Sequence, residues 1–221
     1  MAAGMSASAR PACLSGTCVS PSSSRGDGSA PCTSRVGVPY SSRGRNRSVP
    51  CAAASGDAPG VSLVAEPLTK EAFAPFGQIA RAEEDGVEFG PDDAQLDLSR
   101  GTPRLYIMRL RDKTMSFDTI TFHAQVTQCL GALGDQPWYM AVSAPTKDVE
   151  RFPKREDLKV FKIPPGVFVK MHAATWHAGP LWDAANGPGA MDFYNLELSD
   201  TNQVDHNCHA YEVPFEVIDE K

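Results

Sequence analysis

The chain has 221 residues and a formal net charge of -6 at pH 7. Residues 1–50 hold six arginines, no lysine and one acid, so they carry +5 and the rest of the chain carries -11. An acidic body of this kind repels a phosphate backbone, which argues against nucleic-acid binding. No stretch approaches the roughly 20 apolar residues of a membrane-spanning helix, so no membrane partner is expected.

Residues 1–51 are predicted to be a disordered transit peptide. Twelve serines and five prolines in residues 1–50 leave too little apolar surface to offset chain entropy on folding. Serine-rich, arginine-bearing and acid-poor sequence is typical of organellar targeting. Prolines about every ten residues would interrupt an amphipathic helix, which favours a plastid over a mitochondrion. Val49 to Ala52 resembles a plastid processing site cut after Cys51, and a disordered cytosolic tail is the alternative.

One folded domain is expected at 63–221, after a Gly/Ala/Ser linker at 52–62. Its first element is a short helix within 68–77, because Thr69 can cap the N-terminus and a glycine ends it. Residues 83–101 are acidic and rich in turn residues, so they predict a loop.

Short segments with strand-like patterns follow. They span 104–110, 115–123, 126–133, 137–142, 158–163, 167–171 and 191–198. We expect 158–163 and 167–171 to form a hairpin, and 211–217 to lie at a sheet edge because Pro214 cannot donate a ladder hydrogen bond. One short helix, many short strands and no alternation of strands with helices predict a mainly β fold, a small antiparallel barrel or sandwich.

Two histidines mark the candidate site. His172 and His177 flank a small-residue stretch at 173–175. On an uninterrupted strand their side chains would point to opposite faces, so a turn at 173–175 is needed for both to face one cavity. Imidazoles titrate near neutrality, and the pair can therefore act as general acid and base. The alternative is that one of them is a core or rim residue.

Charged residues supply the other candidates. Arg109 and Lys170 are candidate carboxylate-binding groups, and Arg109 is favoured because a guanidinium offers a bidentate fork. A surface arginine on an edge strand is the alternative. Glu197 can orient a histidine, with a solvent-facing acid as the alternative. The sequence has no G-x-S-x-G motif and no cysteine beside a histidine and an acid, so covalent catalysis has little support.

Three motifs together resemble the ureidoglycolate lyase (ureidoglycolate hydrolase) family of the cupin superfamily. They are T-I-T-F-H-A-Q-V-T-Q with His123 and Gln128, V-K-M-H-A-A-T-W-H with His172 and His177, and M-D-F-Y-N-L-E-L-S-D with Glu197. The segment L-T-K-E-A-F-A-P-F-G is similar to the opening of that family. The similarity covers residues 63 to 217.

The resemblance implies a double-stranded β-helix barrel of the cupin type, usually dimeric, that splits ureidoglycolate to glyoxylate and urea in purine and allantoin catabolism. It also implies Ni²⁺ or another divalent metal, for which His123, Gln128 and His177 are the candidate ligands. Thr121 stands where the first cupin motif usually has a second histidine, and Gln128 replaces an acid. Both substitutions weaken a divalent-metal site, so a site without a cofactor is the alternative.

We therefore expect a plastid-targeted carbon-nitrogen lyase that acts on a small molecule as a homodimer. The expected catalytic residues are His172, His177 and Glu197, and Arg109 and Lys170 are expected to bind substrate. Fold alone does not fix function. Two alternatives remain open: another metal-dependent cupin enzyme acting on a small hydroxy or oxo acid, and a non-catalytic ligand-binding cupin.

Overall fold

The computed structural model describes residues 60–146, 148 and 150–220, so the predicted transit peptide lies outside the described residues. The elements in chain order are β1 (Val61–Pro67), α1 (Lys70–Phe73), β2 (Gly77–Ala80), β3 (Pro103–Arg111), β4 (Ser116–Phe122), β5 (Cys129–Leu133), β6 (Trp138–Ser143), the 3₁₀ turn η1 (Arg155–Asp157), β7 (Lys159–Ile163), β8 (Phe168–Met171), β9 (Trp176–Leu181), β10 (Ala190–Leu198), α2 (Thr201–Val204) and β11 (Asn207–Ile218). Among these residues no helix is long and apolar enough to cross a membrane.

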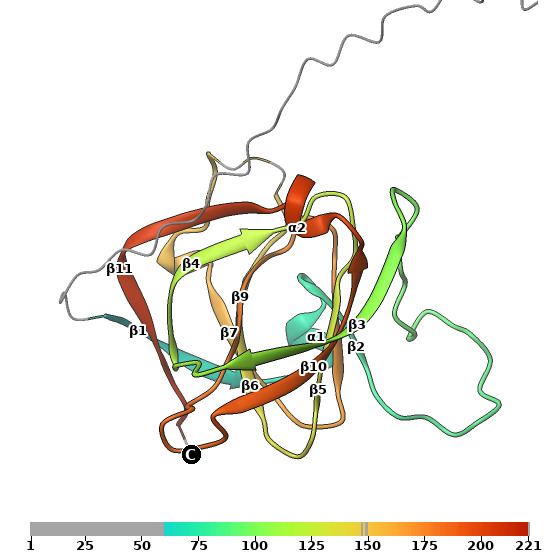
Figure 1. Cartoon of the computed structure of the whole chain (residues 1–221), viewed down its shortest axis with the longest axis horizontal. Helices are drawn as coiled ribbons and strands as arrows, with labels where there is room; N and C mark the ends of the chain where they lie inside the picture. The colour runs from blue at the N-terminus through green and yellow to red at the C-terminus, as the bar shows by residue number, and fades with distance from the viewer. Residues whose placement is uncertain (1–59, 147, 149, 221) are drawn as a thin grey trace, which may run out of the picture. The chain divides into compact units, whose positions relative to one another are not determined.

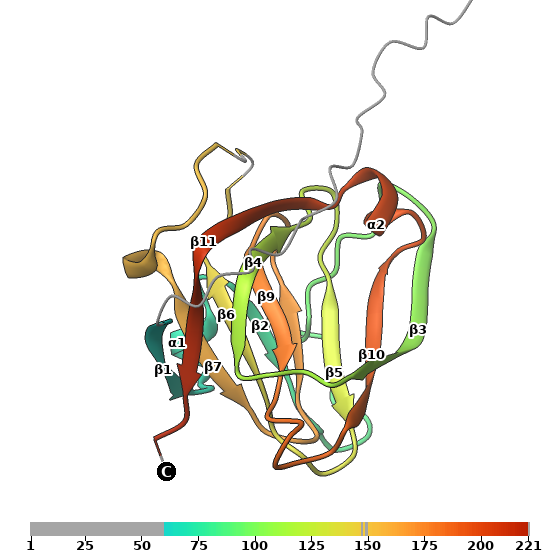
Figure 2. The ribbon, with the colours of Figure 1, turned by 60° about the vertical axis from the view of Figure 1, so that its left-hand side comes forward.

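The strands form two sheets, which confirms the predicted mainly β class. Six strands in the order β1-β11-β4-β9-β6-β7 make a closed barrel, because β1 pairs in parallel with β7. The other five form a sheet in the order β2-β8-β5-β10-β3. Figures 1 and 2 show β3, β5 and β10 of this second sheet on the side of the domain away from β1.

Apolar side chains fill two cores. One lies inside the six-stranded barrel and includes Phe122, Trp176 and Phe215. The other lies between the sheets, because it joins residues of both. Its members include Trp138, Met140, Phe161 and Ile163 from the barrel and Leu130, Val169, Met171 and Phe193 from the five-stranded sheet.

The predicted helix is present but short. Thr69 caps α1 by accepting a hydrogen bond from the Ala72 amide at 3.2 Å, as the sequence indicates. Phe73 is completely buried and packs edge-on against Phe161, with ring centroids 5.4 Å apart. The chain then enters β2, which pairs with β8. Helix α1 thus anchors the segment between β1 and β2 to the core between the sheets.

The predicted hairpin of 158–163 with 167–171 is wrong. Strand β7 pairs with β1 and β6, whereas β8 pairs with β2 and β5. Both strands bury one apolar face in the core between the sheets. The connecting turn therefore carries the chain from one sheet to the other, where β7 and β8 contribute to opposite walls of that core.

The C-terminal segment is not an edge. Strand β11 lies between β1 and β4, and its pairing with β4 shifts register between Ala210 and Phe215. Pro214 falls within this irregularity, where the regular ladder is interrupted and a residue without an amide hydrogen is accommodated. Strand β1 begins at Val61, two residues before the predicted start of the domain at 63.

Gly77 packs closely against the backbone of β8. An added Cβ at Gly77 would lie 2.0 Å from the Lys170 carbonyl oxygen, which is backbone and cannot move without breaking the β2-β8 pairing. We expect Gly77→Ala to lower the free energy of unfolding by about 3 kcal/mol, the range of an overpacked core. The measurement is urea denaturation. In the control Gly90→Ala the new Cβ meets nothing closer than 3.8 Å. Equal stability of the two variants would contradict the packing described.

Candidate active site

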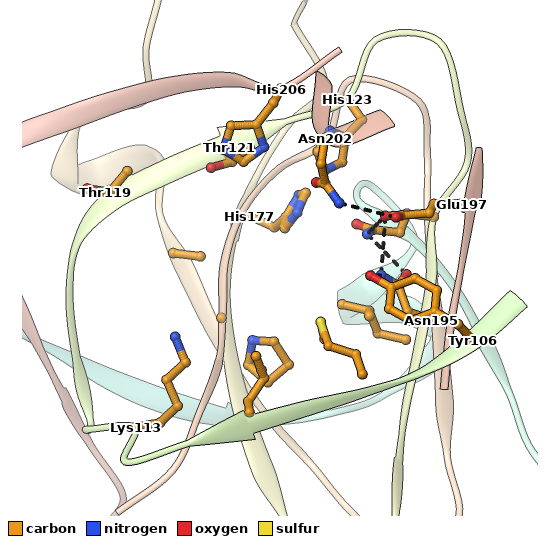
Figure 3. A pocket seen from close by; sticks show the side chains of 17 residues that line it. Tyr106, Lys113, Thr119, Thr121, His123, His177, Asn195, Glu197, Asn202 and His206 are labelled. Carbon is orange, nitrogen blue, oxygen red and sulfur yellow. Dashed lines mark hydrogen bonds between the residues drawn. The ribbon is translucent and has the colours of Figure 1, made fainter. Parts of the chain in front are cut away.

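A cavity of about 300 Å³ opens between the two sheets. Figure 3 shows polar side chains converging on it from β3, β4, β9, β10 and the connections between strands. Apolar side chains of β3 and β5, among them Met108 and Leu130, complete the lining. The polar residues are Tyr106, Lys113, Thr119, Thr121, His123, Gln128, His177, Asn195, Glu197, Asn202 and His206.

Three of these residues are histidines from three separate segments. His123 directly follows β4, His177 lies in β9, and His206 directly precedes β11. The ring centroids of His123 and His177 are 5.3 Å apart, and those of His123 and His206 are 5.8 Å apart. His123 and His177 are buried, whereas His206 is exposed at the rim.

Backbone carbonyls fix the tautomers of the two buried histidines. His123 Nδ1 lies 2.7 Å from the Asp205 carbonyl oxygen, and His177 Nδ1 lies 3.1 Å from that of Thr175. A carbonyl oxygen only accepts hydrogen bonds, so each Nδ1 carries the proton. Each Nε2 therefore keeps its lone pair when the ring is neutral.

Burial keeps both rings neutral. It lowers the pKa of His123, and it lowers the pKa of His177 to about 3, with the neighbouring His123 adding to the effect. At pH 7 the cavity thus holds two neutral imidazoles, each with one basic nitrogen that is not engaged by a backbone carbonyl. Such groups can accept a proton from a bound molecule and give it back.

Asp205 holds His123 in place from two sides. Its carbonyl accepts the His123 ring proton, and its carboxylate accepts the amide hydrogens of Ala124 at 2.9 Å and Gln125 at 2.8 Å. The Ala174 amide also donates to the His123 carbonyl at 2.6 Å. The segment after α2 and the turn before β9 therefore both position this imidazole.

A buried carboxylate and three amides form another wall of the cavity. Glu197 is 1% exposed. Its Oε2 accepts from Gln128 Nε2 at 3.1 Å and Asn195 Nδ2 at 3.2 Å, and its Oε1 accepts from Asn202 Nδ2 at 3.2 Å. Arg104 Nη1 adds a more distant cation at 3.8 Å. The carboxylate expected to orient a histidine is thus bound by amides and orients them.

A cation lies elsewhere in the lining. Lys113 belongs to the connection between β3 and β4, and in Figure 3 it lies across the cavity from Glu197 and Asn195. The hydroxyl residues Thr119 and Thr121 also line the cavity. The site therefore has a cationic part and an amide-rich part, with the histidines in the same lining.

The structure does not bring His172 into this cavity. The turn at 173–175 is present, with Ala174 at a φ of 69°. Val169 and Met171 of β8 face the core, so Lys170 and His172 point to the other side of that sheet. There Lys170 Nζ lies 3.1 Å from His172 Nδ1, and His172 Nε2 lies 3.3 Å from the Ala74 carbonyl oxygen. His123 takes the position beside His177 that His172 was expected to hold.

The two expected substrate cations also lie outside this lining. Arg109 is paired with Asp192 on the neighbouring strand through two bonds of 2.7 Å and borders a separate pocket. Met108 and Leu110 line the cavity, so Arg109 between them points outward. Lys170 is 3% exposed, and burial lowers the pKa of its ammonium group. Lys113 is the cation that the cavity itself offers.

Several residues that line the cavity were not predicted from the sequence as site residues. Tyr106 lies two residues before Met108 and therefore on the same face of β3. This alternation is the one sequence signal that could have placed Tyr106 in the cavity. Lys113 and Asn202 lie in a connection and in the short α2, where no periodicity marks a side chain as inward. His206 precedes β11, which pairs with the distant strand β4. Only this pairing brings His206 beside His123, which follows β4.

The expected metal ligands His123, Gln128 and His177 all line the cavity. Gln128, however, directs its amide nitrogen to Glu197 and Asn195, and Glu197 is already bound by amide hydrogens. Within the described part of the chain no group of three or more His, Cys, Asp or Glu residues is placed to hold a metal ion. This donor set does not fit Ni²⁺ or another divalent ion. It suits proton transfer by the imidazoles themselves.

Fold and site together define a β-barrel protein with a cavity lined by histidines and other polar side chains. Residues 61–218 match the family described as ureidoglycolate lyase. This match covers most of the chain, and the chain belongs to the ureidoglycolate lyase family. No curated protein matches the chain.

The lowered pKa of His177 makes the free energy of unfolding depend on pH. In the unfolded chain this histidine titrates near its ordinary pKa of about 6.5, and in the folded protein near 3. Between these values only the unfolded state binds the proton, so stability falls as the pH falls. We expect His177→Gln to reduce the pH slope of the unfolding free energy between pH 5.5 and pH 4 by about 1.4 kcal/mol per pH unit. Urea denaturation of both proteins measures the slopes, and identical slopes would contradict the neutral, buried state.

Proposed function

We propose that the protein is a ureidoglycolate lyase that breaks the C–N bond of ureidoglycolate to give glyoxylate and urea. Membership of the family supports the substrate. The observation that carries the reaction is the pair His123 and His177, whose Nδ1 protons are held by carbonyls and whose pKa values are lowered by burial. Two neutral proton acceptors therefore lie in one small cavity.

The reaction needs a proton moved from oxygen to nitrogen. In ureidoglycolate one carbon bears a hydroxyl, a carboxylate and the ureido nitrogen. When the C–N bond breaks, its electron pair leaves with the nitrogen, and the O–H pair becomes the second bond of the aldehyde. One proton leaves the hydroxyl and one proton reaches the departing urea, so the proton count balances. A neutral imidazole can accept the first and, as imidazolium, supply the second.

The lowered pKa values set the protonation state in which this cycle begins. They keep the resting imidazoles neutral, so that an imidazole can accept the hydroxyl proton. They also make the transient imidazolium a strong acid toward the urea nitrogen. Lys113 supplies the positive charge for the substrate carboxylate in the same lining.

Two further expectations stay predictions: targeting to a plastid and assembly as a homodimer. The expected divalent metal is not proposed here, because the described residues of the cavity do not form a donor set for it. The homodimer is supported by apolar side chains on the outer side of the five-stranded sheet, where Leu105 and Ile107 are exposed and Tyr194 stacks on Phe168.

Turnover of racemic ureidoglycolate, followed as glyoxylate, tests the proposal. We expect His123→Gln and His177→Gln each to lower kcat by about 100-fold or more, the usual contribution of a general acid or base, with little change in Tm. His172→Gln is the matched control, because that imidazole faces the other side of its sheet, and it should keep most of the activity.

Two results would contradict the proposal. Wild-type protein that releases glyoxylate no faster than spontaneous decay would remove the lyase assignment. Loss of activity in His172→Gln together with full activity in His123→Gln would transfer the catalytic role back to the His172 side of the sheet.

A further inference from the structure

The carboxylate of Glu197 fixes which way three amide side chains point. A carboxylate only accepts hydrogen bonds, so Gln128, Asn195 and Asn202 must each turn their NH₂ group toward it. The oxygen of each amide is thereby directed away from the carboxylate. Gln128 Nε2 donates a second hydrogen bond, at 3.2 Å, to the Asn195 oxygen.

The Gln128 oxygen is left without a partner. Gln128 is 7% exposed and lines the cavity, and its Oε1 is buried with no hydrogen-bond donor in the described structure. A buried acceptor without a donor is unfavourable, and a ligand N–H that reaches it relieves this penalty. This oxygen has almost no accessible surface, so the N–H of a bound molecule reaches it only when the side chains that cover it move.

Tyr106 offers the complementary group beside it. The Tyr106 hydroxyl oxygen accepts from Asn195 Nδ2 at 3.0 Å, so its own hydrogen is left for the Glu197 carboxylate or for a ligand in the cavity. Burial raises the pKa of this hydroxyl, which keeps it protonated. One acceptor and one donor thus stand in the same wall, as the NH₂ and C=O of a carbamoyl group require.

We propose that the wall formed by Gln128, Tyr106, Asn195 and Glu197 is a carbamoyl-binding subsite that reads the urea end of the substrate. Gln128 Oε1 accepts from the terminal NH₂, and the Tyr106 hydroxyl donates to the ureido carbonyl. Glu197 is the positioning residue that orients the amides. This assignment rests on the proposed function, and it places the substrate carboxylate toward Lys113, across the cavity.

Two unreactive probes isolate the contact at Gln128. N-carbamoylglycine is the substrate without its hydroxyl, so it cannot be split, and N-acetylglycine replaces its terminal NH₂ by a methyl group. Calorimetric titration of the full-length protein should show about tenfold tighter binding of N-carbamoylglycine, the effect of one hydrogen bond to an otherwise unpaired buried group. In Gln128→Met, a change of similar size, the two probes should bind within twofold of each other.

A second variant keeps the test open if Gln128→Met does not fold. Tyr106→Phe removes only the hydroxyl, and because both probes contain the carbonyl it should weaken both by a similar factor of about five. Retention of the N-carbamoylglycine preference in Gln128→Met, or unchanged affinities in Tyr106→Phe, would overturn the subsite.

The subsite and the lyase assignment fail in different ways. Wild-type protein that releases glyoxylate but binds both probes equally overturns the subsite alone. Wild-type protein that prefers N-carbamoylglycine but releases no glyoxylate supports the subsite in a protein that binds a carbamoyl ligand without splitting it.

Discussion

The alternation of side chains along each strand decides what reaches the cavity. In β9, Trp176 and Ala178 enter the core of the barrel, and His177 between them faces the cavity. In β10, Asn195 and Glu197 share the inward face, whereas Tyr194 points outward and stacks on Phe168. Where side chains alternate in this way, a polar residue moved by one position would point to the other face of its strand.

The polar side chains in the lining are held by two kinds of hydrogen-bond partner. Backbone carbonyls engage Nδ1 of His123 and His177 and leave the Nε2 atoms for chemistry. The Glu197 carboxylate engages three amides and leaves the Gln128 oxygen without a donor. The first arrangement fixes the tautomers of the imidazoles and the second fixes the orientation of the amides, so the proposed proton transfer and the proposed recognition use separate parts of one lining.

Local patterns in the sequence predicted much of the fold and part of the site. Thr69 as a helix cap, the turn at 173–175 and the principal strands follow from neighbours in the chain. The same period-two rule, applied with Met108 and Leu110 as inward residues, places Arg109 outward, where it meets Asp192. The strand pairings were not predictable in this way. The place of β11 between β1 and β4, which brings His206 to His123, depends on contacts between distant segments.

The central claim is that His123 and His177 act as neutral imidazoles held so by burial. Its most direct test is the dependence of kcat/KM on pH between pH 8 and pH 5 with ureidoglycolate as substrate. The base must be unprotonated, and burial lowers the pKa of both histidines, so we predict that kcat/KM declines only at a pH below the ordinary histidine pKa of about 6.5. A fall in kcat/KM with a midpoint near 6.5, the pKa of an ordinary histidine, would contradict the account.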